Sequence, residues 1–367
     1  MMNKKNFMTL GLALGLAASP ALHAMTVIEN DKNKLDIYGK LRLSLDYGRS
    51  DLGDTPDDPS AGLVDAGHSL STNTTLIGLR GKHQLDGTYS LVWQLEQNFD
   101  PDSPRDRGLG NRDTFAGFQT PAGLFRFGIM DTPYKRNGIM LSRFTTTVAD
   151  PQALLGRGSG GAQRLSLRAK NAIRWDQDFL DRRLKVALEY GSGQQDTEGV
   201  ADDNGSDMWS VGLTWVGGDL VAGVAYVDWS KLYNDGDVSG FNAGANYRIG
   251  PARLGVVYDH LEADTVDFLN RDAYGAFVTW DLGPLYTIGA QWIHADESDA
   301  GDDEADQYSL VGTWHANQAL DLYLAATTTI NRGSGQYPTA DYAHGDHINT
   351  VPGGDPEVLS VGMSYKF

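Results

Sequence analysis

The chain has 367 residues, no cysteine, 44 glycines, 13 prolines and a formal net charge of -18. This composition excludes collagen, a Pro-rich disordered chain and a disulfide-stabilised fold. The acidic balance also disfavours a nucleic-acid partner, because phosphate binding needs concentrated lysine and arginine.

Residues 1–24 have the pattern of a secretory signal peptide. Lys4 and Lys5 precede the apolar run FMTLGLALGLAA, and the small-residue segment SPALHA follows it. The apolar run is shorter than the roughly 18–20 residues that span a bilayer, so a signal anchor is the weaker interpretation. We expect cleavage after Ala24, with Ala21 as the alternative, and a mature domain of residues 25–367.

The first predicted strand, LDIYGKLRLSLDY at residues 35–47, alternates between two kinds of side chain. One parity holds Leu35, Ile37, Leu41, Leu43, Leu45 and Tyr47, and the other holds Asp36, Tyr38, Lys40, Arg42, Ser44 and Asp46. Residues 241–249, 320–330 and 358–367 repeat this arrangement. Runs of about ten residues are long enough to cross a bilayer as tilted strands. We therefore expect lipid on the apolar face and water on the polar face.

Connections between such runs alternate between tight turns and long loops rich in Asp and Gly, as in outer-membrane barrels. A mean hydropathy of -0.36 excludes a helical membrane protein, so only a barrel could span the bilayer. The breaks predict an all-β fold, a transmembrane antiparallel β-barrel of about sixteen strands. The expected strand LVAGVAYVDWS at residues 220–230 departs from the alternation, because both of its parities are apolar. A soluble lectin-like β protein is an alternative, although strands in sandwiches are usually about 5–6 residues long.

Aromatic side chains fall near the strand ends on the apolar parity, where headgroup-level girdles are expected. They are Tyr47, Trp93, Trp175, Tyr190, Trp215, Tyr247, Tyr258, Trp280, Tyr286, Trp292, Trp314 and Tyr365. Aromatic residues of a buried core are the alternative interpretation.

The connection over residues 132–163 is long and too apolar for a solvated tail. Its apolar side chains are Ile139, Met140, Leu141, Phe144, Val148, Leu154 and Leu155. Long connections without regular structure are usually functional or disordered. We expect this one to fold inward and pack on the barrel wall, with an external loop as the alternative.

Five segments together resemble the general bacterial porins of the Gram-negative outer membrane. They are LDIYGKLRLSLDY, TLIGLRGKHQLDGTYSLVWQLEQNF, RDTFAGFQTPAGLFRFGIMDTPY, RAKNAIRWDQDF and VGMSYKF. The resemblance covers residues 25–367 and implies a sixteen-stranded barrel with an infolded third loop. It also implies a homotrimer, passive diffusion of ions and small hydrophilic solutes, and a terminal aromatic, Phe367, that the barrel-assembly machinery reads. Outer-membrane lipid and lipopolysaccharide would surround the barrel.

The resemblance also implies a charged pore constriction, to which the inward parity assigns the cations Lys40, Arg42, Arg80, Arg112, Arg126, Arg168 and Arg174. Lys82 and Lys170 share this parity. Many relatives carry a further second-strand arginine where this chain has Leu76, so the familiar cationic cluster is altered. The acidic stretch typical of the family's third loop is absent. Asp150 is the carboxylate left in the middle of that loop, beside Arg136, Arg143, Arg157 and Arg164.

These charges predict a net positive constriction with a weak anion preference, since fixed charges in a narrow low-dielectric channel bias ion entry. Merely solvated lumen cations are the alternative. Four acidic residues, Glu96, Glu189, Asp228 and Asp259, could also face the lumen and offset the cations.

The sequence is also compatible with other functions. A substrate-specific channel for phosphate or another anionic solute is compatible with the arginine-rich wall. A barrel enzyme is less favoured, because no G-x-S-x-G stretch appears, and we expect no catalytic residue and no cofactor. His344 and His347 have metal-like spacing but lie in a Gly-rich loop without further fixed ligands, so we assign no metal. Bridging of acidic outer loops to lipopolysaccharide by divalent cations is also open.

Overall fold

The computed structural model describes residues 24–51, 66–102, 109–160, 163–194, 205–233, 236–340, 343–345 and 350–367. The predicted signal peptide therefore lies outside the described residues, apart from Ala24. No helix in the described part of the chain is long and apolar enough to cross a membrane.

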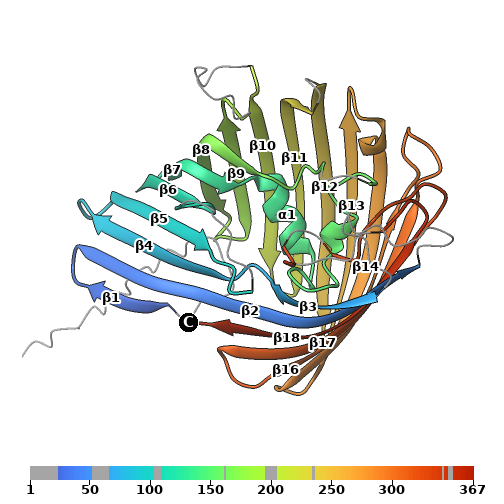
Figure 1. Ribbon diagram of the computed structural model, residues 1–367. Coiled ribbons are helices and arrows are strands. Elements are labelled where there is room, and N and C mark those ends of the chain that lie inside the picture. The colour runs from blue at the N-terminus through green and yellow to red at the C-terminus, as the bar shows by residue number, and fades with distance from the viewer. Residues whose placement is uncertain are drawn as a thin grey trace, which may run out of the picture.

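Strands make up almost all of the regular structure (Figure 1). They are β1 (Met25–Glu29), β2 (Asn33–Asp51), β3 (Ala66–Thr72), β4 (Leu76–Gln84), β5 (Ser90–Asn98), β6 (Thr114–Thr120), β7 (Gly123–Asp131), β8 (Arg168–Phe179), β9 (Leu184–Gly191), β10 (Met208–Gly217), β11 (Leu220–Tyr233), β12 (Gly236–Ile249), β13 (Ala252–Ala263), β14 (Arg271–Leu282), β15 (Tyr286–Ala295), β16 (Ala305–His315), β17 (Leu320–Asn331) and β18 (Asp355–Lys366). The helical elements are α1 (Pro133–Leu141), η1 (Pro151–Ala153) and η2 (Asp267–Leu269).

Every strand pair is antiparallel, and the sheet closes because β18 pairs with β2 over residues 355–366 and 40–51. We call each of the sixteen full-length strands of the barrel wall a stave. Two of these staves are each built from two strand segments. β3 and β4 pair in succession with one edge of β2, and β18 and β1 pair in succession with the other edge. The eighteen segments therefore form a closed sixteen-stranded barrel, as predicted.

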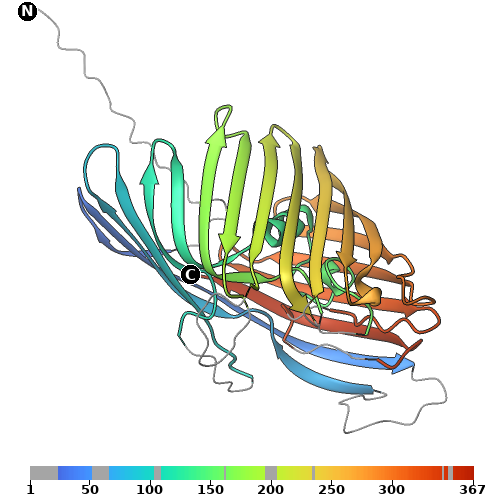
Figure 2. The same cartoon turned by 90° about the horizontal axis from the view of Figure 1, so that it is seen from above.

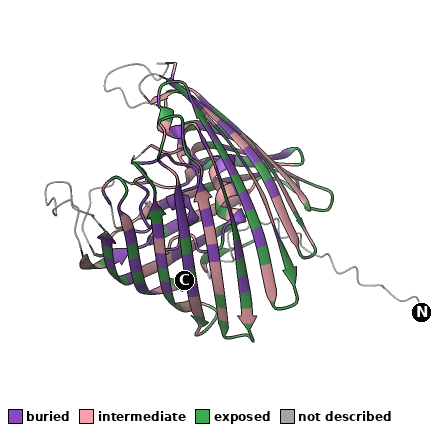
Figure 3. Cartoon of the chain, turned by 90° about the vertical axis from the view of Figure 1, so that its right-hand side faces the viewer, coloured by how far each residue is buried: buried purple, intermediate pink, exposed green. Residues whose placement is uncertain are grey.

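Alternate residues face opposite sides of the wall, because side chains along a strand point alternately to its two faces. In Figure 3 the exposed and buried colours alternate along the strands. On β18, Leu359, Val361 and Tyr365 are exposed on the outer surface, whereas Ser360 is buried on the inner side. On β2, Leu45 and Tyr47 are outward and exposed. The predicted two faces are confirmed.

The third loop, residues 132–167 between β7 and β8, enters the barrel and carries α1 (Figures 1 and 2). Thr132 begins α1 by accepting a hydrogen bond from the backbone of Lys135, and Pro133 occupies the first turn, where a missing N–H costs nothing. The helix packs mainly on β10, β11 and β12. The inward fold predicted from the loop's apolar residues is confirmed: Leu141, Phe144, Val148, Leu154 and Leu155 are buried, although Ile139 is exposed.

The third loop explains why β11 is apolar on both parities. Its inner side chains Ala225, Val227 and Trp229 are buried in a cluster with Tyr134 and with Leu165. Its outer parity contains Val224, which is exposed on the outer wall. One face of β11 therefore meets lipid and the other meets the loop.

Candidate functional site: the charged lumen beside the third loop

Arg42 lies where the stave made of β3 and β4 is interrupted. Instead of a regular ladder, the Thr75 hydroxyl bonds both the backbone N–H of Arg42, at 2.9 Å, and its carbonyl, at 3.0 Å. Such irregularities re-aim the side chain of the opposing residue. The Arg42 guanidinium donates to Oγ1 of Thr146 in the third loop at 2.7 Å and to Oγ of Ser364 at 3.3 Å. Arg42 thus links the β2 wall to the tip of the third loop.

Lys40 follows the same inward parity on β2 and is partly exposed. No carboxylate lies within ion-pair distance of Lys40 or Arg42 among the residues that the structure describes. The β2 wall therefore presents two positive charges to the lumen without direct compensation.

A larger charged network lies on the wall from β5 to β9 and on the start of the third loop. Its members are the cations Arg112, Arg126, Lys135, Arg136, Arg168 and Arg174, and the carboxylates Glu96, Asp113, Asp131, Asp176 and Glu189. Each of these cations is within 4.0 Å of at least one of the carboxylates. Among the described residues, this network holds one cation more than it holds carboxylates.

Arg168 bridges two carboxylates at the centre of this network. Its Nε lies 2.9 Å from Asp113, and its Nη2 lies 3.1 Å from Asp131. Lys135 Nζ also lies 3.0 Å from Asp131 Oδ1, and this ion pair ties the wall to α1. Ion pairs removed from bulk water are stabilised only when each charge has several such partners. The network therefore holds these side chains in fixed positions.

For Lys135, burial and ion pairing have opposite effects on the pKa. Burial lowers the pKa of Lys135 to about 8, although the charge of Asp131 acts in the other direction. The residue belongs to α1, in the lumen, and not to a strand.

Arg126 and Arg174 face each other directly across β7 and β8 and share Asp176. Arg174 also reaches Glu189 at 3.3 Å. Both guanidinium groups are buried, so they support the wall more than they line the open passage. Arg80 pairs with Asp36 at 3.0 Å toward the short-turn end of the barrel and stacks over the Tyr38 ring.

Asp150, predicted at the constriction, is only 1% exposed. Its carboxylate accepts from the backbone N–H groups of Thr146, at 2.7 Å, and of Gln152, at 3.0 Å. It therefore caps η1 inside the loop. Among the other loop cations, Arg136 lies 3.6 Å from Asp113, Arg143 is exposed, and Arg157 and Arg164 form a backbone bridge with each other.

Three of the four suspected lumen acids have the expected orientation. Glu96 and Glu189 belong to the charged network, and Asp259 accepts from Tyr134 in α1 and from the backbone of Gly156. Asp228 is different, because it shares the outward parity of β11 and pairs in register with the exposed Trp209. The expectation that Asp228 could face the lumen was wrong.

The third loop is held against the barrel wall by residues that the sequence analysis did not single out. Asn137 donates to Asn242 at 2.7 Å, and Asn242 donates to the Tyr134 carbonyl at 3.1 Å. Arg271 on β14 donates to the carbonyls of Leu154 and Arg157. Alternation could have placed Asn242 and Asp176 on the inner face, but no local pattern indicates which loop atoms they meet.

No group of three or more His, Asp or Glu side chains in the described ranges is arranged to hold a metal ion. His344 is buried beside Ser44 and Asp46, with Nε2 at 3.3 Å from each partner oxygen. His347, which was considered together with His344 as a possible metal ligand, lies outside the described residues.

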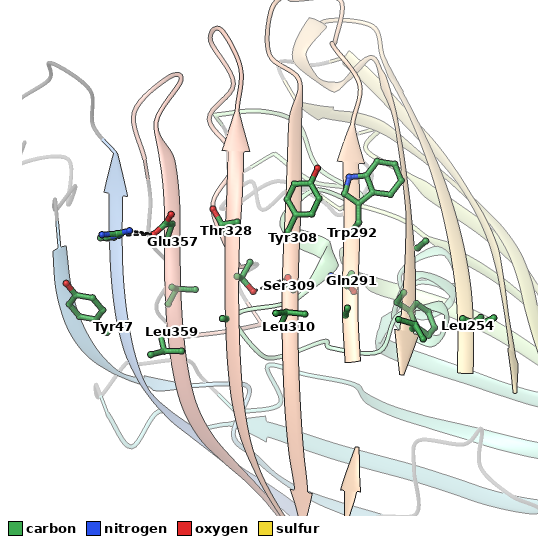
Figure 4. Close-up of a pocket in the computed structure, with 18 residues that line it drawn as sticks. Tyr47, Leu254, Gln291, Trp292, Tyr308, Ser309, Leu310, Thr328, Glu357 and Leu359 are labelled. Carbon is green, nitrogen blue, oxygen red and sulfur yellow. Dashed lines mark hydrogen bonds and ion pairs between the residues drawn. The ribbon is translucent and has the colours of Figure 1, made fainter. Parts of the chain in front are cut away.

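The outer wall contrasts with the lumen. Figure 4 shows a hollowed stretch of the outer wall across β13 to β18 and β2, where Leu254, Leu310 and Leu359 lie below Tyr308 and Trp292. Most of the predicted girdle aromatics are exposed on this outward parity. A broad apolar exterior with aromatic rims matches a hydrocarbon environment.

A closed barrel with a lipid-compatible exterior, a charged interior and an inserted loop defines a membrane channel of the bacterial outer-membrane class. The family model for Gram-negative porins matches residues 11–334. The chain therefore belongs to the Gram-negative porin family, and it is an outer-membrane pore for passive diffusion.

Several known proteins resemble it over nearly their whole length. Major outer membrane protein P.IB of Neisseria gonorrhoeae is 23% identical, covering 97% of this chain and 88% of the relative. A monosaccharide porin of a Halomonas species is 21% identical, covering 88% and 94% respectively. The solved anion-selective porin of Comamonas acidovorans superposes with a TM-score of 0.77 at 19% identity, covering 92% of this chain and all of that one. The trimer form of OmpT from Vibrio cholerae has a TM-score of 0.65 at 16% identity, covering 92% and 100%.

Proposed function

We propose that this pore conducts ions and small hydrophilic solutes with a weak preference for anions. The observation that carries the proposal is the pair Lys40 and Arg42, which face the lumen with no carboxylate at ion-pair distance in the described part of the chain. A guanidinium or ammonium in a narrow low-dielectric passage lowers the energy of an entering anion. The resemblance to an anion-selective porin agrees with this sign.

The residues form two groups in this proposal. Lys40 and Arg42 set the field at the constriction, and Arg112 and Arg168 contribute from the neighbouring network, where carboxylates partly cancel them. Arg80, Arg126 and Arg174 are paired, and Asp150 is internal to the loop, so these four have smaller effects on permeating ions.

The test is the reversal potential of the purified protein in a planar bilayer under a KCl gradient. We expect chloride preference in the wild type and a shift toward potassium in Lys40→Gln and Arg42→Gln. Arg49→Gln is the matched control, because Arg49 lies on β2 but faces outward, where it pairs with Glu357 at 2.6 Å. Clear potassium preference in the wild type would overturn the proposal. Phosphate conductance that saturates at low concentration, with other anions excluded, would instead favour a substrate-specific channel.

We also propose that the functional unit is a homotrimer and that it transports solutes without catalysis. The trimer form of an outer-membrane protein with the same fold supports this assembly. The short strands β5 to β7 carry the outward aromatics Trp93, Phe118 and Phe127, which offer an apolar surface for a neighbouring subunit. Chemical cross-linking in outer-membrane vesicles should give a trimer ladder, and Phe118→Asp with Phe127→Asp should weaken it. A purely monomeric wild-type pattern would contradict the assembly.

Export and insertion complete the proposal. Residues 1–24 would be removed during secretion, Phe367 would be read by the barrel-assembly machinery, and lipopolysaccharide would contact the outer rim. N-terminal sequencing of the mature protein checks the cleavage site directly. A mature chain that still begins at Met1 would remove the signal-peptide assignment.

A further inference from the structure

Two arginines face each other on the inner wall below the third loop. Arg248 on β12 and Arg253 on β13 are direct cross-strand partners on the inward parity. Like charges directly opposite each other destabilise a strand pair. The repulsion between Arg248 and Arg253 therefore needs to be offset by negative charge nearby.

A third arginine comes from the loop itself. Arg143 follows α1, between Leu141, which packs against Gly244, and Phe144, which packs against Gly289. Gly289 pairs with Thr279, and Thr279 pairs with Arg253, so this part of the loop lies at the level of Arg253. The three arginines therefore gather on the periplasmic side of the third loop.

Among the described residues, too few carboxylates lie near these three arginines to neutralise their positive charges. Arg248 Nη2 lies 3.0 Å from Asp281 Oδ2, whereas Arg253 donates to the neutral Asn246 at 2.6 Å. Arg143 has neither a carboxylate nor a hydrogen-bond partner in the part of the chain that the structure describes, and its side chain is open to the lumen water. Arg253, Asp281 and Arg248 are the charged groups that act on the Arg143 guanidinium. Three cations thus share one carboxylate.

We propose that Arg143, Arg248 and Arg253 form an anion-binding station on the periplasmic side of the third loop, suited to multivalent oxyanions such as phosphates. Planar guanidinium groups bind phosphate and carboxylate oxygens through paired N–H donors, which chloride cannot match. The station deepens the proposed anion preference and rests on it. It lies on the β12–β13 wall, whereas Lys40 and Arg42 belong to β2.

The experiment measures block of the KCl current by inorganic pyrophosphate in single channels. We expect concentration-dependent block of the wild type and at least a tenfold higher half-blocking concentration in Arg143→Gln and in Arg253→Gln. These two positions are chosen because their replacement leaves no carboxylate without its partner. Arg253→Lys, which keeps the charge but loses the planar fork, should fall between wild type and Arg253→Gln. Arg182→Gln, in an exposed turn, is the control and should behave as wild type.

Reversal potentials in plain KCl separate this inference from the proposed function. Chloride preference without pyrophosphate block, or block that both Gln variants leave unchanged, would overturn the station while the general preference stands. Block that depends on Arg143 and Arg253 supports the station, even if Lys40→Gln leaves the reversal potential unchanged. Heat-modified gel mobility confirms that each variant forms the barrel.

Discussion

At the scale of single residues, Lys135 couples the charge of the lumen to pH. Its pKa of about 8 lies below the ordinary 10.5 because the side chain is buried. Between these values the unfolded chain binds the additional proton, so this residue's contribution to stability rises with pH through that window. Below pH 8 the group is charged and adds to the positive lumen.

We therefore predict that anion preference falls as pH rises from 7 to 9. Lys135 should contribute a component centred near pH 8, and this component should be lost in Lys135→Met, which is uncharged throughout. Reversal potentials at a series of pH values measure it. A titration that persists unchanged in Lys135→Met would belong to another group.

Single residues also show where sequence reasoning succeeds and where it stops. Alternation placed Lys40 and Arg42 on the inner face correctly, because the period of two fixes the face of every residue in a regular strand. The same rule should have excluded Asp228, which shares the outward parity of Val224. Asp150 could not be placed, because its role as a helix cap depends on the local path of a loop.

At the scale of elements, the third loop is seated by glycines of the wall. A Cβ at Gly223 would lie 2.0 Å from Asn137 Oδ1, and one at Gly212 would lie 3.1 Å from Pro133 Cβ. α1 can approach the sheet this closely because these positions lack a side chain. The loop's inward fold was predictable from its apolar content, but its seat on β10 to β12 depends on contacts distant in sequence.

The substitution Gly223→Val tests whether α1 needs this close approach to the barrel wall. The added side chain should displace Asn137, loosen α1 and increase single-channel conductance, because the loop then obstructs less of the lumen. Gly312→Val is the matched control, since a Cβ at Gly312 meets nothing within 4 Å. Unchanged conductance in Gly223→Val, with an intact barrel, would show that the loop does not need this close approach.

At the scale of the whole molecule, the barrel closes where Phe367 meets Gly39. The two residues exchange backbone hydrogen bonds of 2.8 and 3.1 Å, and the Phe367 ring covers the face of Gly39, where a Cβ would lie 2.3 Å from the ring. Phe367 is thus part of the closed wall, whatever its role during insertion. The sequence predicted closure through its even strand number, but not that an aromatic ring would cover a glycine there.

Gly39→Val should therefore destabilise the folded barrel by about 1–3 kcal/mol, the usual cost of overpacking. Denaturant unfolding of the detergent-solubilised protein, followed by loss of heat-modified mobility, measures the change. Gly87→Val, in an open turn, is the control and should have little effect. Equal stability of the Gly39 and Gly87 variants would show that the ring moves aside freely.

The stave that β18 and β1 share brings the first and last strands of the barrel together in space. Met25 is in register with Ile37 and Phe367 bonds to Gly39, so the ends follow each other along one edge of β2, about 7 Å apart. Residues 25–367 therefore form nearly a closed loop of chain, interrupted at one place. Its ends could be spliced by a short linker and the ring reopened at the Gly218 turn, which would give a circular permutant with the same staves in a different gene order.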